Sequence, residues 1–215
     1  MPTTTITPVS SSSSMSFSSS SSFTPNNKLD LFFSPDLIPA QVIAELHPSV
    51  HLRPLSSTDY HRGHLSVLSV LTHAPDPGYS AWLKQYEAMR SSPNTYYPIV
   101  IISKETDRIV GAGTVIVERK FLRGLGRVGH IEDIAVDKRE QGKKLGLRII
   151  QALTGLSESR DIGGCYKTIL DCSDENIPFY EKCGFEKKEN EMAKYAPEAA
   201  ALPKPKTTPK VKAKL

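Results

Sequence analysis

Two acids and a glycine-lysine turn that follows them have the residue types for binding and proton transfer. Glu132 and Asp133 stand in a β-rich stretch, and Gly142 begins the turn that leads into an apolar, helically spaced run. A glycine at a helix start lets unpaired backbone amides approach an anion, and the partial positive charge there favours a phosphate or pyrophosphate. Lys143 and Lys144 add mobile positive charge. A solvated, lysine-rich helix start fits the same residues, and spacing alone does not separate the two.

A second group of polar residues lies in the segment 170–185. Pro178 is tolerated in a first helical turn, so Asn176 is expected to cap a short helix that Gly184 ends. Tyr180 then projects beyond the strand that carries Asp171 and can reach a ligand at that sheet edge. The alternative is a Tyr180 that anchors the core and exposes its hydroxyl.

The elements that must position these residues follow from apolar spacing. Residues 131–136 predict a strand, and Leu145, Ile149, Leu153 and Leu156 predict a helix that begins at Gly142. Residues 166–172 predict a fifth strand, residues 177–183 a short helix, and Phe185 onward a segment that closes the sheet.

The preceding part of the chain supplies the other elements. A first strand is expected at residues 51–55, a hairpin at 98–103 and 109–119, and a basic loop at 120–127. Two helices precede the hairpin. The first, capped by Ser57 or Thr58, carries Leu65, Leu68 and Leu71, and the second carries a core stripe of Trp82, Tyr86 and Met89. Helices between strands indicate an α/β or α+β fold around one sheet.

The 215 residues have room for one domain with tails. We expect residues 1–45, with a serine-rich run, to be mostly disordered, residues 46–195 to form the domain, and residues 196–215 to be a disordered Pro/Ala/Lys-rich tail. Five lysines and one glutamate in this tail account for the net charge of +4, so the body is not basic. A solvated tail is favoured over weak contact with RNA or an anionic membrane.

Cysteine usage and hydropathy bear on the compartment. Cys165, Cys172 and Cys183 are odd in number and lack paired metal-ligand spacing, which favours packed, reduced thiols and no bound metal. No apolar run approaches a membrane span, no secretory signal is evident, and no arginine precedes Arg53, unlike an arginine-rich transit peptide. We expect a cytoplasmic protein with no membrane span and no specific nucleic-acid ligand.

Four motifs together resemble the GNAT superfamily of acyl-CoA-dependent N-acetyltransferases and, within it, the glucosamine 6-phosphate N-acetyltransferases. They are Gly129-His-Ile-Glu-Asp-Ile-Ala-Val, Gln141-Gly-x-x-Leu-Gly, Gly164-Cys-Tyr-Lys-Thr-Ile-Leu-Asp-Cys and Asn176-x-x-Phe-Tyr-Glu-Lys-Cys-Gly-Phe. The resemblance spans residues 50–195 and implies a mixed, mostly antiparallel sheet flanked by helices. The glycine loop and Asn-x-x-Phe-Tyr specify the cofactor, whereas the Glu-Asp and Tyr-Lys segments point to the aminosugar.

The resemblance implies direct transfer of the acetyl group of acetyl-CoA, as co-substrate, to the 2-amino group of glucosamine 6-phosphate, within UDP-N-acetylglucosamine synthesis. The sequence shows no evident Ser-His-Asp or Cys-His arrangement for covalent catalysis. Implied catalytic residues are Tyr180, which stabilises the thiolate, Asp171, which orients the amine, Glu132, and the backbone of Ile134. Implied acetyl-CoA contacts come from Ile134, Ala135, Val136, Gly142, Lys143, Lys144, Leu145, Gly146, Leu147, Asn176 and Tyr180.

The resemblance also implies a homodimer with a sugar site shared across its interface. Implied sugar contacts come from Thr72, Lys120, Phe121, Leu122, Arg123, Glu132, Asp133, Tyr166, Lys167 and Asp171. Glu132 and Asp133 point to opposite faces of a regular strand, so both serve the sugar only if the strand is bulged. Otherwise one acid is exposed and the other structural. Tyr195 stands where some relatives carry an arginine, and Lys144 where many carry glycine or alanine.

Two other functions fit part of the pattern. A GNAT enzyme that acetylates a peptide or lysine amine would share the cofactor motifs and differ in its acceptor groove. A non-catalytic acyl-CoA-binding scaffold would also keep the helix start, although Tyr180, Asp171 and Glu132 argue against it. Turnover on glucosamine 6-phosphate compared with a panel of peptides separates the two enzymes, and the absence of thiol release would favour the scaffold.

Overall fold

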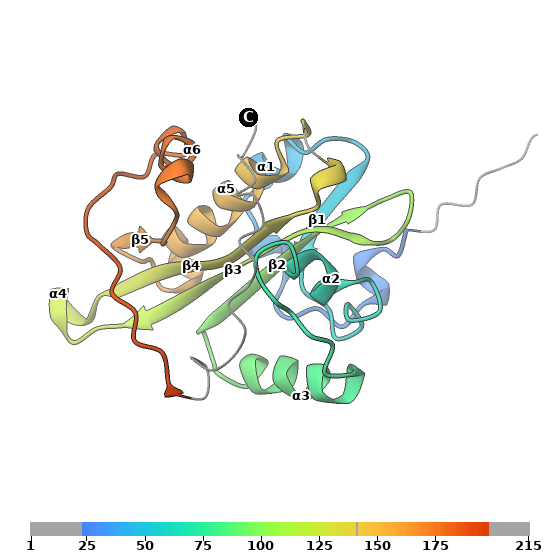
Figure 1. Ribbon diagram of the computed structural model, residues 1–215, viewed down its shortest axis with the longest axis horizontal. Helices are drawn as coiled ribbons and strands as arrows, with labels where there is room; N and C mark the ends of the chain where they lie inside the picture. Colours follow the sequence, from blue (N-terminus) through green and yellow to red (C-terminus); the bar gives the residue numbers. More distant parts are fainter. Residues whose placement is uncertain (1–22, 141, 198–215) are drawn as a thin grey trace, which may run out of the picture.

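Five strands form one sheet whose spatial order follows the chain, β1-β2-β3-β4-β5 (Figure 1). This computed structural model describes residues 23–140 and 142–197. The first three strand pairs are antiparallel and β4 pairs with β5 in parallel, which confirms the expected mixed, mostly antiparallel sheet. The strands are β1 (Val50–Pro54), β2 (Tyr96–Ser103), β3 (Ile109–Arg119), β4 (Arg127–Val136) and β5 (Lys167–Ile169).

Helices cover both faces of the sheet. Residues of α1 and α5 share one core cluster with one sheet face, and residues of α2 and α3 share a second cluster with the other. The α-helices are α1 (Ala40–Ala44), α2 (His64–Leu68), α3 (Tyr79–Arg90), α4 (Leu122–Leu125), α5 (Leu145–Glu158) and α6 (Ile177–Lys182). Single 3-10 turns are η1 (Asn26–Lys28), η2 (Pro35–Leu37), η3 (Lys138–Glu140), η4 (Arg160–Ile162) and η5 (Asp174–Asn176).

The apolar patterns explain the two layers. Ile99 to Ile102 in β2 are fully buried, because helices cover both faces of this inner strand. The expected stripe of α5, Leu145, Ile149, Leu153 and Leu156, is buried against the sheet. Trp82 and Tyr86 of α3 are buried as well, so the core reading of that stripe holds for these two residues.

Several element boundaries differ from the expectations. α5 begins at Leu145, not Gly142, because Lys144 takes a left-handed φ of 55° and starts the helix later. α2 follows Gly63, at a φ of 88°, and not a serine or threonine cap, and it ends before Leu71, which is exposed. β5 spans three residues. Among the described residues after α6, none forms the expected closing strand.

Residues before the expected domain start at 46 also pack on the core. The serine-rich run at residues 10–22 lies outside the described residues, but α1 follows at Ala40–Ala44. Ile38 and Val42 are buried in the cluster that contains α5. The packed part of the chain therefore begins earlier than apolar periodicity suggested, because these short turns contribute isolated apolar side chains.

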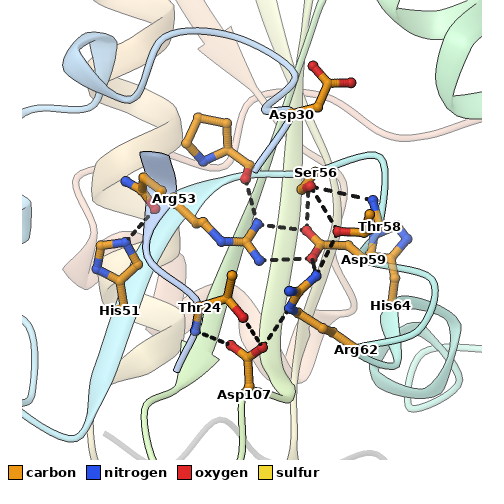
Figure 2. Close-up of polar contacts among 12 residues, drawn as sticks. Thr24, Asp30, His51, Arg53, Ser56, Thr58, Asp59, Arg62, His64 and Asp107 are labelled. Carbon is orange, nitrogen blue, oxygen red and sulfur yellow. Dashed lines mark hydrogen bonds and ion pairs between the residues drawn. The ribbon is translucent and has the colours of Figure 1, made fainter. Parts of the chain in front are cut away.

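A buried polar network holds the segment that leads into α2 (Figure 2). The guanidinium of Arg53 in β1 donates to both carboxylate oxygens of Asp59, at 2.7 and 2.8 Å, and both side chains are buried. Arg62 bridges Asp59 at 3.3 Å and Asp107 at 3.0 Å, and Asp107 accepts from the hydroxyl of Thr24 at 2.7 Å. The network ties the N-terminal segment, β1 and the β2–β3 turn to one another.

Candidate active site

A bulge in β4 brings both acids of the Glu-Asp pair to the surface. Glu132 pairs with Thr114 and Ala135 with Ala112, so β4 holds one residue more than β3 between these pairs. Within this bulge, the backbone of Asp133 has a left-handed φ of 56°. Both acids are exposed. The strand is therefore bulged, which is the condition under which both acids could contact one sugar.

Beyond the bulge, one edge of β4 separates from β5. The parallel pairing covers Val128, Gly129 and His130, which oppose Lys167, Thr168 and Ile169. Within the described residues, positions 131–136 have no strand partner on that side. The backbone of Ile134, Ala135 and Val136 is therefore an edge that an extended, amide-containing ligand can pair with, as a strand would.

The start of α5 offers uncapped backbone amides. Among the described residues no side chain caps the helix, and its first bond runs from the amide of Arg148 to the carbonyl of Lys144 at 3.1 Å. The amides of residues 145–147 therefore point out of the first turn. Gly142 precedes them at a φ of 88°, a conformation that suits glycine. The side chain of Leu145 is buried, so its contribution to a ligand would come from its backbone.

The two lysines at this turn differ. The ammonium of Lys143 lies 2.6 Å from a carboxylate oxygen of Glu140, which already compensates its charge. Lys144 is exposed beside the helix start. Of the two, Lys144 is better placed to meet an anion with its full charge.

Helix α6 packs against the beginning of α5. The ring of Phe179 lies 3.6 Å from where a side chain on Gly146 would begin, so α6 meets the first turn of α5. Tyr180 is half-buried against the α5 side of the core. Burial, with the nearby thiols of Cys172 and Cys183, raises the pKa of Tyr180 to about 12, so its phenol stays a proton donor at neutral pH. Asn176, at the start of α6, donates to the hydroxyl of Ser173 at 3.3 Å.

Charges from three segments act on Glu132 at the bulge. Burial raises the pKa of Glu132, and the charges of Asp133, Asp171 and Glu191 raise it further, whereas His130 lowers it. Asp171 follows β5 and is exposed, and Glu191 comes from the segment after α6. The result is an acidic site that suits a cationic amine and holds a carboxylate with increased proton affinity.

The expected phosphate ligands make other contacts or are exposed to solvent. Lys120 pairs with Glu118 at 2.5 Å, and the guanidinium of Arg123 lies 5.8 Å from the ring centre of Tyr166. Lys167 is exposed in β5. Figure 1 places α4 at the outer end of the β3–β4 hairpin.

The remaining expected sugar contacts are exposed. Thr72 lies in the segment between α2 and α3, and it has no hydrogen bond to another site residue among those described. Phe121 and Leu122 are 96% and 73% exposed, so the β3–β4 end carries apolar side chains in solvent. Tyr195 is exposed as well.

The cysteines do not form a nucleophilic site. Cys172 is exposed, which corrects the expectation that it is packed, whereas Cys165 and Cys183 are half-buried. Burial and the carboxylate of Asp171 raise the pKa of Cys172, so its thiol stays protonated at neutral pH. A thiol in that form is a poor nucleophile.

Sequence reasoning missed His130 and Glu118. The imidazole Nε2 of His130 lies 2.9 Å from a carboxylate oxygen of Glu118 on the neighbouring strand. The signal was available, because His130 and Glu132 are two residues apart and such residues share a strand face. The strand was predicted from its apolar residues alone, so the common face of these two polar residues was not considered.

Two further properties concern the described part of the chain. Residues 23–140 and 142–197 contain no group of three or more His, Cys, Asp or Glu side chains that could hold a metal ion. None of the helices in these ranges has the length and apolar character needed to cross a bilayer.

Known proteins share both the sequence and the fold. The sequence model of the acetyltransferase (GNAT) family matches residues 62–185, which include β4, α5 and α6. A Dictyostelium discoideum protein named glucosamine 6-phosphate N-acetyltransferase 1 is 39% identical over 148 residues, 69% of this chain and 92% of that protein. A glucosamine 6-phosphate N-acetyltransferase of Candida albicans is 44% identical over 133 residues, covering 62% and 87%. The crystal structure of the Arabidopsis thaliana glucosamine-6-phosphate N-acetyltransferase aligns with a TM-score of 0.65 at 38% identity, covering 68% of this chain and 97% of that one.

Proposed function

This chain belongs to the acetyltransferase (GNAT) family, and from this premise we propose that it is a glucosamine 6-phosphate N-acetyltransferase. It would transfer the acetyl group of acetyl-CoA to the 2-amino group of glucosamine 6-phosphate, and the product would be N-acetylglucosamine 6-phosphate. The relatives that carry this name in three kingdoms match most of their own length, which supports the same reaction here.

The observation that carries the proposal is the shape of β4. Its unpaired edge at residues 131–136 lies next to the bulge that exposes Glu132 and Asp133. A thioester arm that pairs with this edge would bring its carbonyl close to an acidic site that binds an amine. Donor and acceptor groups would thus meet at one place along the strand, which is the positioning that direct transfer needs.

We assign the diphosphate end of acetyl-CoA to the start of α5. The uncapped amides of residues 145–147, the turn at Gly142 and the exposed Lys144 make a site for an anion. Phe179 contacts this first turn, and we assign Tyr180 of the same short helix to the part of the ligand that would continue toward β4. When bound, acetyl-CoA supplies an activated carbonyl.

Three groups of the chain would carry the transfer. Glu132 accepts a proton from the amine nitrogen, which bonds to the carbonyl carbon while the carbon-sulfur bond breaks. The backbone amide of Ile134 donates to the carbonyl oxygen, and the phenol of Tyr180 gives its proton to the departing sulfur. The pKa of Tyr180, about 12, keeps that proton available, and Asp171 orients the amine.

A homodimer would complete the sugar site. Five residues separate Arg127 from Glu132, which is about 17 Å along a strand, and Arg123 lies beyond Arg127. The backbone of Arg123 therefore starts well away from Glu132, and we propose that its guanidinium meets the phosphate of a sugar bound at the partner's Glu132. Phe121, Leu122 and Leu125, 96%, 73% and 71% exposed, make an apolar surface that a second copy would bury and that would bring Lys120 and Arg123 to the partner's site.

The cellular role follows from the reaction. N-acetylglucosamine 6-phosphate would feed UDP-N-acetylglucosamine synthesis, and we assign the enzyme to the cytoplasm, where free sugar phosphates and reduced thiols are found. The three free cysteines agree with a reducing compartment.

A peptide-amine acetyltransferase is the second candidate, because Glu132 and the three carboxylates that act on it would also attract a lysine side chain. A thiol-release assay with acetyl-CoA compares glucosamine 6-phosphate, glucosamine and a panel of lysine peptides. The proposal expects the highest kcat/KM with glucosamine 6-phosphate and a large loss without the phosphate. Preference for a peptide would support the second candidate, and no release with any acceptor would support a non-catalytic acyl-CoA-binding scaffold.

A further inference from the structure

A row of charged side chains leads along β3 and β4 to Glu132. Gly129 and Ile131 face α5, because a side chain on Gly129 would meet Ser157 of that helix and Ile131 is buried in the α5 core cluster. His130 and Glu132 alternate with them and therefore share the opposite face of the strand. Two residues along one face are about 7 Å apart, a distance at which charges interact.

Glu118 holds His130 in this row. Ile116 pairs with His130, and Glu118 lies two residues further along β3 on the same face. A carboxylate oxygen of Glu118 is 2.9 Å from Nε2 of His130, and its other oxygen is 2.5 Å from the ammonium of Lys120. A carboxylate at Nε2 favours a proton on that nitrogen, which sets the orientation of the ring.

We propose that His130, held by Glu118, is a positioning residue for acetyl transfer, because its cationic form stabilises the carboxylate form of Glu132 that accepts the amine proton. This inference rests on the proposed function, in which Glu132 is the base. The proton passes from the amine nitrogen to a carboxylate oxygen of Glu132 and then to water, while His130 keeps its own protons. His130 touches neither substrate in this account and acts through Glu132.

His130 acts on Glu132 in the opposite direction from the other groups around it. Burial raises the pKa of Glu132, and so do Asp133 on β4, Asp171 beyond β5 and Glu191 of the C-terminal segment. Among the described residues that act on Glu132, His130 is the one that lowers this pKa. Its loss would leave Glu132 with carboxylate neighbours alone. As the pH falls, the carboxylate form of Glu132 that accepts a proton would then be lost at a higher pH.

The first test is the pH profile of kcat/KM with glucosamine 6-phosphate for the full chain and its variants. His130→Gln keeps a polar side chain but removes the cation, and we expect its acid limb to move to higher pH, with activity on that limb about threefold lower and the plateau nearly unchanged. His130→Lys, which restores a cation, should return the limb toward its original position. His47→Gln, at an exposed histidine before β1, is the matched control and should leave the profile unchanged.

A merely structural role would look different. It would lower the plateau of both His130 variants without moving the acid limb, and that result would overturn the inference. Glu118→Gln should shift the limb in the same direction as His130→Gln, since it frees the imidazole from its position.

The second test needs no turnover. A carbon-13 NMR titration of the Glu132 carboxyl in the full chain should show its midpoint at higher pH in His130→Gln than in the unmodified protein. An unmoved midpoint would contradict the inference even if the enzyme is active. Absence of turnover on glucosamine 6-phosphate in the unmodified protein would instead overturn the proposed function, so the two failures are distinguishable.

Discussion

Glu132 and Asp133 follow one another in β4, yet both side chains reach the surface, because Asp133 turns the backbone to a φ of 56°. In a regular strand one of the two would point into the α5 core. The same irregularity lies where the pairing of β4 with β5 has ended after His130. One local distortion therefore accounts for both an acidic acceptor site and an open strand edge beside it.

Removal of the phenol at Tyr180 tests the proton donor. Tyr180→Phe keeps the ring that packs with Phe179 and Phe185, so the fold should persist. We expect kcat to fall about 100-fold with little change in KM for acetyl-CoA, because the departing sulfur loses its proton source. Stopped thiol-release kinetics measure both constants, and a kcat equal to that of the unmodified enzyme would remove Tyr180 from the mechanism.

The buried carboxylate of Asp59 should be a major contributor to stability. Asp59→Ala leaves the guanidinium of Arg53 buried without its charge partner, and we expect the free energy of unfolding to drop by about 3–5 kcal/mol. Urea denaturation gives this difference. Arg90→Ala, which breaks the exposed pair with Asp30, is the control and should cost less than about 1 kcal/mol. Equal losses in both variants would show that burial of the Arg53–Asp59 pair has no special weight.

Acid should weaken the fold through His64. Burial lowers the pKa of His64 to about 4, and its Nδ1 accepts a hydrogen bond from the indole of Trp82 at 3.2 Å. The unfolded chain binds a proton at this position below about pH 6.5 while the folded chain does not, so stability falls as the pH drops from about 6.5 toward 4.

Urea midpoints at pH 7 and pH 5 measure this effect. We expect the unmodified protein to lose about 1–2 kcal/mol between them, since His64 is partly exposed and the full shift is not realised. His64→Gln should lose less. Some slope should remain from His51, whose pKa burial also lowers. An identical slope in both proteins would contradict the assignment to His64.

The apolar end of the β3–β4 hairpin predicts the oligomeric state. Leu122→Glu puts a charge on a side chain that is 73% exposed, so the single subunit should keep its stability. Sedimentation should find a dimer for the unmodified chain and a monomer for the variant. The monomer should also show a higher KM for glucosamine 6-phosphate, because Lys120 and Arg123 no longer reach a neighbouring site. Leu71→Glu, at an exposed leucine away from this end, is the control.

The sequence predicted most of the elements that build the site. The alternation around Ile131 reflects a strand with one buried face. The helical spacing of Leu145, Ile149 and Leu153 reflects a helix face buried against the sheet. The predicted start of α5 was wrong by three residues. The left-handed turn at Lys144 has no apolar signature, and Gly142 looked like the natural first residue.

Features that depend on tertiary contacts were harder to predict from the sequence. Arg53 lies in the expected first strand, but its full burial could not be predicted, because it depends on Asp59, which lies six residues away in a turn. Phe185 suggested another strand, whereas it packs on Tyr180 as part of the α6 turn. The bulge was named as a condition, but its occurrence depends on the pairing with β3, which one strand's sequence does not specify.

The central claim is that this chain forms an amide bond between the acetyl group of acetyl-CoA and the nitrogen of glucosamine 6-phosphate. Reaction of acetyl-CoA labelled with carbon-13 at the carbonyl and glucosamine 6-phosphate labelled with nitrogen-15 tests it directly by NMR. We expect a product signal with one-bond coupling between the two labels, formed at catalytic turnover and abolished or greatly slowed in Tyr180→Phe. Labelled acetate, labelled protein or unchanged acetyl-CoA in place of that signal would contradict it.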